Sequence, residues 1–206
     1  MVTIQGTIEH MHWVERDGQQ LPRRIGGHPA LDFCNTLAGW GGPPLPKGEW
    51  LRTYGVFVGW AGYADLLDAE EEGGLRGRSG ARAKAVLDDA RRLRRRLRTA
   101  VLDPSHARAM SDVGAAVRTA AEGLRLEPGA RPTWRVDAAR RIELPLLRVA
   151  WAAGELLTSG ELDRVKACPG DECGWLFLDR SGRRRWCSMD SCGNRAKVRA
   201  HAARQR

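Results

Sequence analysis

The sequence lacks any apolar run approaching the roughly 18 residues that a membrane-spanning helix requires. Its first residues, 1–7, also lack the basic stretch followed by an apolar stretch that marks a secretory signal. These two absences argue against a membrane or secreted protein. We therefore expect a soluble, cytoplasmic protein.

Catalytic motifs are missing as well. There is no Walker loop, no nucleotide-binding glycine fingerprint, no HExxH motif and no Gly-x-Ser-x-Gly turn. The glycine-rich segment 39–48 contains three prolines, which do not suit a phosphate-binding loop. We expect that the protein is not an enzyme. A zinc-stabilised enzyme or small-molecule-binding protein is the alternative interpretation.

Acidic side chains are fewer than basic ones: 34 Lys and Arg stand against 25 Asp and Glu, a net charge of +9. The excess lies near the C-terminus, because residues 164–206 contain eleven basic and four acidic side chains. The preceding 163 residues carry only +2. A nearly neutral body followed by a basic segment favours a polyanionic partner.

Hydrophobic periodicity predicts a mostly helical α+β fold. Residues 2–21 alternate like strands, with a hairpin turn at Asp17-Gly18. The arginines of Arg91–Arg98 are interpreted as a solvated helix face, because Asp88 and Asp89 lie one turn away. The helix that opens at Pro145 is apolar nearly all round and should be central. We expect the helices over about 28–38, 54–72, 81–102, 107–124 and 145–157, a turn region over 125–131 and a short strand over 133–136.

Four of the five cysteines fall in the basic segment, as two pairs with four residues inside each pair and thirteen residues between the pairs. Two close pairs joined by a short segment are typical of a closed structural zinc site. The segments 175–178 and 183–186 flank a four-residue turn and predict a hairpin that joins the pairs. We expect one zinc ion per chain, held by Cys168, Cys173, Cys187 and Cys192.

Two other roles for these cysteines are conceivable. Two disulfides would require an oxidising compartment, which neither a signal peptide nor an even number of cysteines supports. Oxidation of the thiolates with release of zinc is a chemically reasonable addition to the zinc site. Cys34 lies far from the cluster in sequence and is interpreted as a small buried hydrophobic residue.

The segment Cys192-Gly-Asn-Arg195, preceded by Arg184-Arg-Trp-Cys-Ser188, strongly resembles the CGNR zinc-finger family. The segment 28–37, His-Pro-Ala-Leu-Asp-Phe-Cys-Asn-Thr-Leu, is similar to the start of the ABATE domain that precedes this finger in the family. The resemblance implies a stress-induced transcription regulator that binds DNA. It also implies an ABATE-like domain over residues 1–160 and a treble-clef-like zinc finger over 161–206.

The finger stays cationic when four thiolates and Zn²⁺ together contribute −2. A helix is expected from about Ser191, with Cys192, Ala196, Ala200 and Ala203 as a stripe packed against the finger. Exposed Arg and Lys side chains suit phosphate contacts and guanine recognition, in DNA or in RNA. The candidate nucleic-acid-binding residues are Arg183, Arg184, Arg185, Arg195, Lys197, Arg199 and Arg204.

The larger domain offers weaker candidates. Asp32 and Asn35 lie three residues apart on one helix and could face a ligand pocket with Trp134 or Trp151; bracing of nearby loops is the alternative. His10 and His12 have a metal-compatible spacing on one strand, which is usually coincidental, and His28 is interpreted as structural. We expect this domain to sense a small-molecule effector or to mediate homodimer formation.

Overall fold

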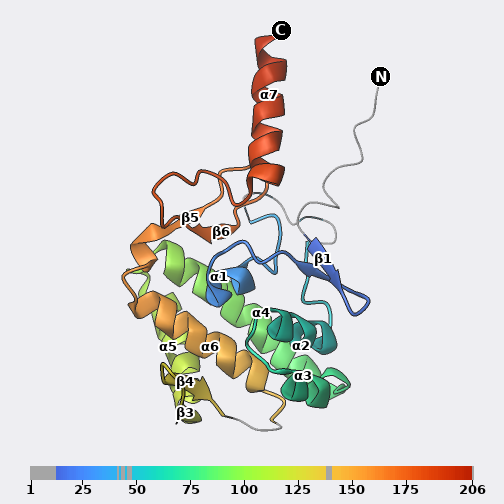
Figure 1. Ribbon diagram of the computed structural model, residues 1–206, viewed down its shortest axis with the longest axis vertical. Coiled ribbons are helices and arrows are strands. Elements are labelled where there is room, and N and C mark those ends of the chain that lie inside the picture. The colour runs from blue at the N-terminus through green and yellow to red at the C-terminus, as the bar shows by residue number, and fades with distance from the viewer. Residues whose placement is uncertain (1–12, 41, 43–44, 46–47, 138–140, 206) are drawn as a thin grey trace.

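The computed structural model describes residues 13–40, 42, 45, 48–137 and 141–205. Helices form most of the body (Figure 1), and the described strands pair two by two into three antiparallel hairpins. No helix in the described ranges is long and apolar enough to cross a membrane. The elements are β1 (Trp13–Arg16), β2 (Gln19–Pro22), α1 (Pro29–Cys34), α2 (Tyr54–Tyr63), α3 (Ala69–Arg76), α4 (Ala81–Leu102), α5 (Ala107–Ala121), β3 (Leu124–Glu127), β4 (Thr133–Val136), α6 (Leu144–Thr158), β5 (Val165–Ala167), β6 (Leu176–Leu178) and α7 (Asn194–Arg204).

Helix α6 lies at the centre of the body, as its apolar sequence predicts. It packs against α1, α4 and α5. At the end of the molecule beyond β5 and β6, α7 extends away from the body, and the β3–β4 hairpin lies at the opposite end (Figure 1). The C-terminal helix is therefore presented to solvent on a compact helical base.

Several elements form where the sequence predicts them. Asp17 and Gly18 turn the chain between β1 and β2 with φ angles of 51° and 72°. This left-handed conformation is the one that a two-residue hairpin turn requires and that Asp-Gly tolerates. Helix α4 spans the predicted 81–102 and buries its apolar stripe in the core. The part of the predicted strand region before Trp13 lies outside the described residues.

The single helix predicted over residues 54–72 is wrong, because two helices occupy this region. Helix α2 ends at Tyr63, and Asp65 then takes a left-handed conformation with φ 59°. The side chain of Asp68 accepts from the Glu71 N–H, and Glu71 accepts from the Asp68 N–H, each at 2.9 Å. This capping box starts α3 and was a readable signal in the sequence.

The helix predicted over 107–124 also ends early, at Ala121, and β3 occupies part of the predicted turn region. A Cβ at Gly123 would lie 2.8 Å from the Asp137 carbonyl oxygen. The close approach of the two chain segments at this glycine allows β3 to pair with β4 immediately after the helix.

The arginine run on α4 is only partly a solvated face, and that prediction is wrong for half of its members. Arg94 is 1% exposed and donates to Glu49 at 2.8 Å and to the Thr36 carbonyl at 3.0 Å. Arg91 donates to the Leu51 carbonyl at 2.7 Å, and Arg98 to the Gly174 carbonyl at 2.6 Å. Long arginine side chains reach past the apolar stripe and donate hydrogen bonds to carbonyl groups of the loops that pack against α4.

The predicted hairpin between 175–178 and 183–186 does not form. Strand β6 pairs instead with β5, with Lys166 opposite Phe177. Residues 183–186 are irregular, because Asp179 bonds the Arg184 N–H at 3.1 Å and the Lys166 ammonium at 2.6 Å and thereby fixes a loop. The first cysteine pair therefore lies in the turn of the β5–β6 hairpin.

Candidate metal centre and nucleic-acid interface

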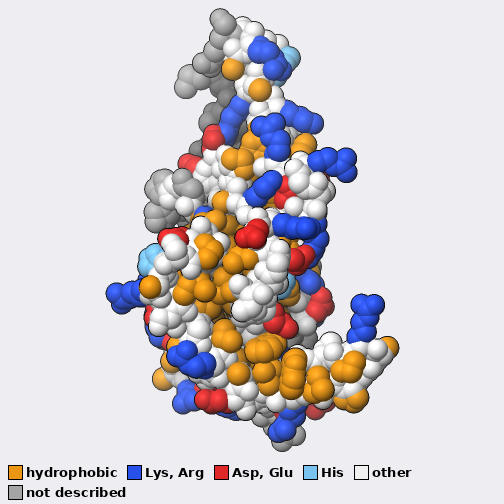
Figure 2. All heavy atoms as spheres, turned by 90° about the vertical axis from the view of Figure 1, so that its left-hand side faces the viewer, with side chains coloured by type: hydrophobic (Ala, Val, Ile, Leu, Met, Phe, Trp, Pro, Cys, Tyr) orange, Lys and Arg blue, Asp and Glu red, His pale blue; other side chains and the backbone are white. Residues whose placement is uncertain are grey.

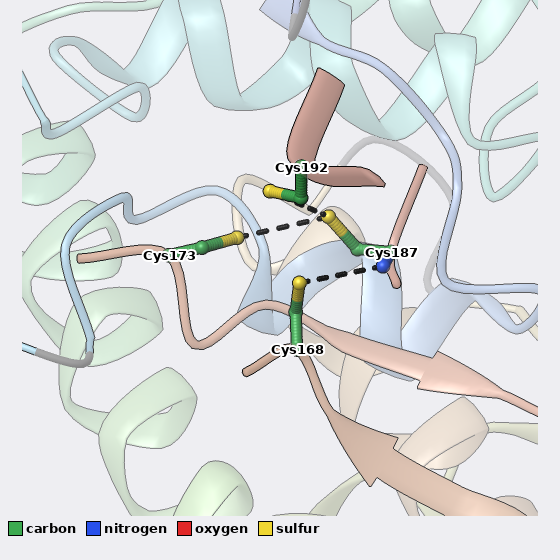
Figure 3. Close-up of side chains that lie close together, drawn as sticks. All are labelled: Cys168, Cys173, Cys187 and Cys192. Carbon is green, nitrogen blue, oxygen red and sulfur yellow. Dashed lines mark hydrogen bonds between the residues drawn. The ribbon is translucent and has the colours of Figure 1, made fainter. Parts of the chain in front are cut away.

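The four cysteines meet although they come from three separate segments. Cys168 follows β5 and Cys173 lies in the turn before β6, whereas Cys187 and Cys192 lie at the end of the irregular loop and in the helical turn Met189–Gly193 before α7. All four side chains are buried and point toward one centre (Figure 3). Their Sγ atoms lie within 4.8 Å of one another.

The distances between the sulfur atoms fit a zinc ion. A Zn–S bond of about 2.3 Å in a tetrahedron places neighbouring sulfur atoms about 3.8 Å apart. The Sγ of Cys187 lies 3.7 Å from that of Cys173 and 3.6 Å from that of Cys192. Four buried thiolates leave no position for water or substrate, so the finger forms a site for one structural zinc.

Electrostatics explain why a cation is needed there. Interaction with the Cys168 sulfur is the main cause that raises the pKa of Cys173 and of Cys187, and Cys192 and burial raise the pKa of both further. Four adjacent thiolates therefore cannot form without a compensating charge. Zn²⁺ supplies that charge, and its binding is coupled to loss of the thiol protons.

Two further groups stabilise the ligands. The Cys187 N–H donates to the Cys168 sulfur at 3.4 Å, and the Arg195 guanidinium donates to the Cys192 sulfur at 3.1 Å. The backbone at Gly170 packs closely against the cysteine site. A Cβ at this position would lie 3.0 Å from the Cys192 sulfur, so a larger residue would not fit without a shift. Arg195 therefore lies at the metal site and not on the exposed helix surface.

The metal module is joined to the body by contacts that sequence reasoning missed. The Trp175 indole donates to the Leu37 carbonyl at 2.9 Å. Arg98, which bonds Gly174, also lies over the Trp40 ring at 4.7 Å. Leu176 and Leu178 belong to the main core of the larger domain. The finger and the larger domain therefore share one packed interior.

Two other predicted nucleic-acid-binding arginines have partners within the chain. Arg184 lies over the Phe177 ring at 4.5 Å and donates to the Ile25 carbonyl at 2.6 Å, so its interpretation as an exposed residue is wrong. Arg199 forms an ion pair with Asp171 on the surface. Attraction between the Arg184 guanidinium and the face of the aromatic ring, together with the hydrogen bond to Ile25, explains its place.

Four predicted side chains remain exposed, and the described residues provide no ion pair for them: Arg183, Arg185, Lys197 and Arg204. The first three line an open groove of about 720 Å³ between the loop after β6 and the start of α7. Met189, 53% exposed, also lines it. Figure 2 shows Lys and Arg side chains gathered over this end of the molecule.

The predicted alanine stripe on the C-terminal helix does not pack against the finger. No described residue of α7 is buried, and Ala200 and Ala203 are exposed. Alanine methyl groups bury too little apolar surface to hold a helix down. The helix carries Arg195, Lys197, Arg199 and Arg204 and no acidic residue.

Asp32 and Asn35 brace the fold instead of lining a pocket. The Gly26 N–H donates to Asp32 at 2.7 Å. Asn35 is fully buried, and its side-chain amide forms hydrogen bonds with the C=O and the N–H of Leu176. The hollow lined by Trp134 and Trp151 contains neither residue. Burial is the main cause that raises the Asp32 pKa to about 6.

The remaining sequence predictions have mixed outcomes. Cys34 is fully buried in the core, as predicted for a small hydrophobic residue. His28 caps α1, because its Nδ1 accepts from the Ala30 N–H at 3.2 Å. His10 and His12 lie outside the described residues.

Comparison with known families gives two matches. Residues 164–205 match the CGNR zinc finger, and residues 27–160 match the ABATE domain, described as "putative stress-induced transcription regulator". The two families and their order along the chain are those that the sequence resemblance predicts. A search among curated proteins finds no match.

Proposed function

The chain belongs to the ABATE family and ends in a CGNR zinc finger, and we propose that it regulates transcription by binding duplex DNA through this finger. One observation carries the proposal: α7 and the adjacent groove present Arg183, Arg185 and Lys197 to solvent without acidic partners. Arginine and lysine in this arrangement suit DNA phosphates.

The zinc site sets the geometry of this surface. It fixes the start of α7 through Cys192 and the end of the loop through Cys187, and so holds both walls of the groove in one orientation. Zinc supplies folding free energy and no catalysis, since its four ligands close the site. Arg195 acts through Cys192, as a positioning residue.

The proposal extends to the larger domain. Because the finger shares its interior with this domain, an effector that alters the packing of the domain would also alter the packing of the finger. We assign to the domain a regulatory role, in the cytoplasm, without catalytic activity.

The test is a salt titration of binding to random duplex DNA and to duplex and single-stranded RNA of equal length. If the four unpaired cations meet phosphates, the logarithm of the affinity should fall with the logarithm of salt with a slope of about −3 to −4. Replacement of Arg183, Arg185 and Lys197 by Ala should reduce the slope by about 3.

A matched triple variant provides the control. Arg95, Arg108 and Arg118 are exposed arginines of α4 and α5, and their replacement by Ala removes the same net charge outside the finger. This variant should bind like the wild type. Equal weakening in both triple variants, or no salt-dependent binding at low salt, would contradict the proposal. If the protein binds RNA more tightly than duplex DNA, the partner is RNA and not DNA.

A further inference from the structure

The β3–β4 hairpin carries apolar side chains that the body does not cover. Leu124 and Val136 pack into the core, and Leu126 and Trp134 follow them on the same hairpin face. Leu126 is 56% and Trp134 54% exposed. Hydrophobic side chains gather at this end of the molecule, opposite α7 (Figure 2). The apolar face therefore extends beyond the core that it helps to form.

The outer edge of this hairpin is open. Strand β4 packs on α6, whereas β3 has no strand partner other than β4 among the described residues. The Asp137 N–H donates to the Gly123 carbonyl at 2.8 Å, so Gly123 and Asp137 form a hydrogen-bonded pair of the antiparallel ladder. Since hydrogen-bonded pairs alternate in an antiparallel ladder, Leu126 points its N–H and C=O away from β4.

The sequence of this edge is complementary to itself. In an antiparallel pair of two β3 strands with a two-fold axis at Leu126, each Leu126 faces its copy in a hydrogen-bonded pair. Arg125 of each chain then faces Glu127 of the other, so that two opposite charges meet on both sides of the axis. A shift of the strands by one residue in either direction would lose this match.

We propose that β3 is a self-association edge, at which a second copy of this chain pairs to form a four-stranded sheet. The pairing places Trp134, two copies of Leu126 and the second Trp134 side by side on one face. It also satisfies the outward N–H and C=O of Leu126 and adds strands to a two-stranded sheet, which is marginal in isolation.

The dimer leaves the finger free. Helix α7 and the hairpin lie at opposite ends of the long axis (Figure 1), so self-association does not cover the groove beside α7. The proposal is therefore independent of nucleic-acid binding, and its test uses protein alone. Pairing of four-residue strands forms a small interface, which predicts a concentration-dependent dimer.

The experiment is sedimentation velocity of the full zinc-loaded chain from about 1 to 200 μM, the range in which a small interface dissociates. The mean mass should rise from 22.8 kDa toward twice that value. Leu126→Lys places two ammonium groups at the two-fold axis and should keep the protein monomeric. Leu102→Lys alters an exposed leucine at the end of α4 and should leave the dimer unchanged.

A charge exchange tests the register. Arg125→Glu places a glutamate opposite a glutamate on both sides of the two-fold axis and should weaken the dimer about tenfold. The double variant Arg125→Glu/Glu127→Arg restores opposite charges and should recover the affinity to within about threefold. Both variants lose the ion pair of Arg125 with Asp137, and the double variant also loses that of Glu127 with Arg135, so a recovery of affinity cannot come from restored contacts within the chain. A monomer at every wild-type concentration, or a dimer that Leu126→Lys leaves intact, overturns the proposal, and so does a double variant as weak as Arg125→Glu.

Discussion

The side chain of Asn35 forms with Leu176 the two hydrogen bonds that a neighbouring strand would form in a sheet. Its Nδ2 donates to the Leu176 carbonyl at 2.9 Å, and its Oδ1 accepts from the Leu176 N–H at 2.8 Å. These two bonds join α1 to β6 across 141 residues of sequence. The contact explains how a strand of the zinc module can lie in the interior of the larger domain without unpaired backbone groups.

Replacement of Asn35 by Ala should strongly destabilise the protein. The variant leaves the N–H and C=O of Leu176 buried and without their partner, at a cost of about 1–3 kcal/mol for each group. Chemical denaturation of the zinc-loaded protein measures the loss. Thr36→Ala, which removes a nearby buried hydroxyl, is a comparison in which the Leu176 contacts persist. An Asn35→Ala variant that loses less than about 0.5 kcal/mol would contradict this role.

Loss of a zinc ligand should affect the whole chain. Replacement of Cys173 or Cys187 by Ser should abolish the binding of about one zinc per chain, because the closed site needs four thiolates. Since Leu176 and Leu178 are part of the main core, the larger domain should lose stability as well. Metal analysis and thermal unfolding measure the two effects. Cys34→Ser, outside the cluster, should retain zinc. Zinc loss with an unchanged unfolding transition of the larger domain would show that the two parts are independent.

Asp32 should make the protein less stable as the pH rises. Burial raises its pKa to about 6 from an ordinary value of 3.8, so the folded protein binds this proton more tightly than the unfolded chain. The folded state therefore loses stability as the pH rises through the interval between these values, and the loss levels off above about pH 6.

Asp32→Asn retains an oxygen that can accept from Gly26 and removes the titration. Between about pH 5 and pH 7, the unfolding free energy of the variant minus that of the wild type should increase by about 1 kcal/mol. Urea denaturation in saturating zinc measures this difference, and the subtraction removes the titration of the zinc ligands. A difference that does not change with pH would refute the assignment.

Arg184 should contribute to stability and not specifically to DNA affinity. Arg184→Ala removes the stack on Phe177 and leaves the Ile25 carbonyl without its donor, at a cost of about 1–3 kcal/mol. Arg183→Ala and Arg185→Ala, at exposed neighbouring positions, should each change stability by less than about 0.5 kcal/mol. Thermal unfolding of the three variants decides the matter. Equal stability of all three would return Arg184 to the candidate DNA-binding residues.

Local sequence signals account for much of the fold. The Asp17-Gly18 turn, helix α4 and the apolar helix α6 follow from turn chemistry and periodicity, which act over a few residues. The four zinc ligands follow from cysteine spacing, because coordination chemistry restricts which residues can serve. The errors at 54–72 and 107–124 concern the boundaries of helices. The capping box at Asp68 and Glu71 shows that the sequence contains a local signal for the start of α3.

The sequence by itself therefore determined the helical class, the metal site and the family to which the chain belongs. Only the tertiary structure decided which polar groups turn inward: Arg94 toward Glu49, Arg184 toward Phe177, and Asn35 toward Leu176. The sequence alone does not show whether an arginine or asparagine side chain faces water or a buried carbonyl group. Its place depends on backbone groups that lack partners after distant segments have packed, and no short-range pattern contains that information.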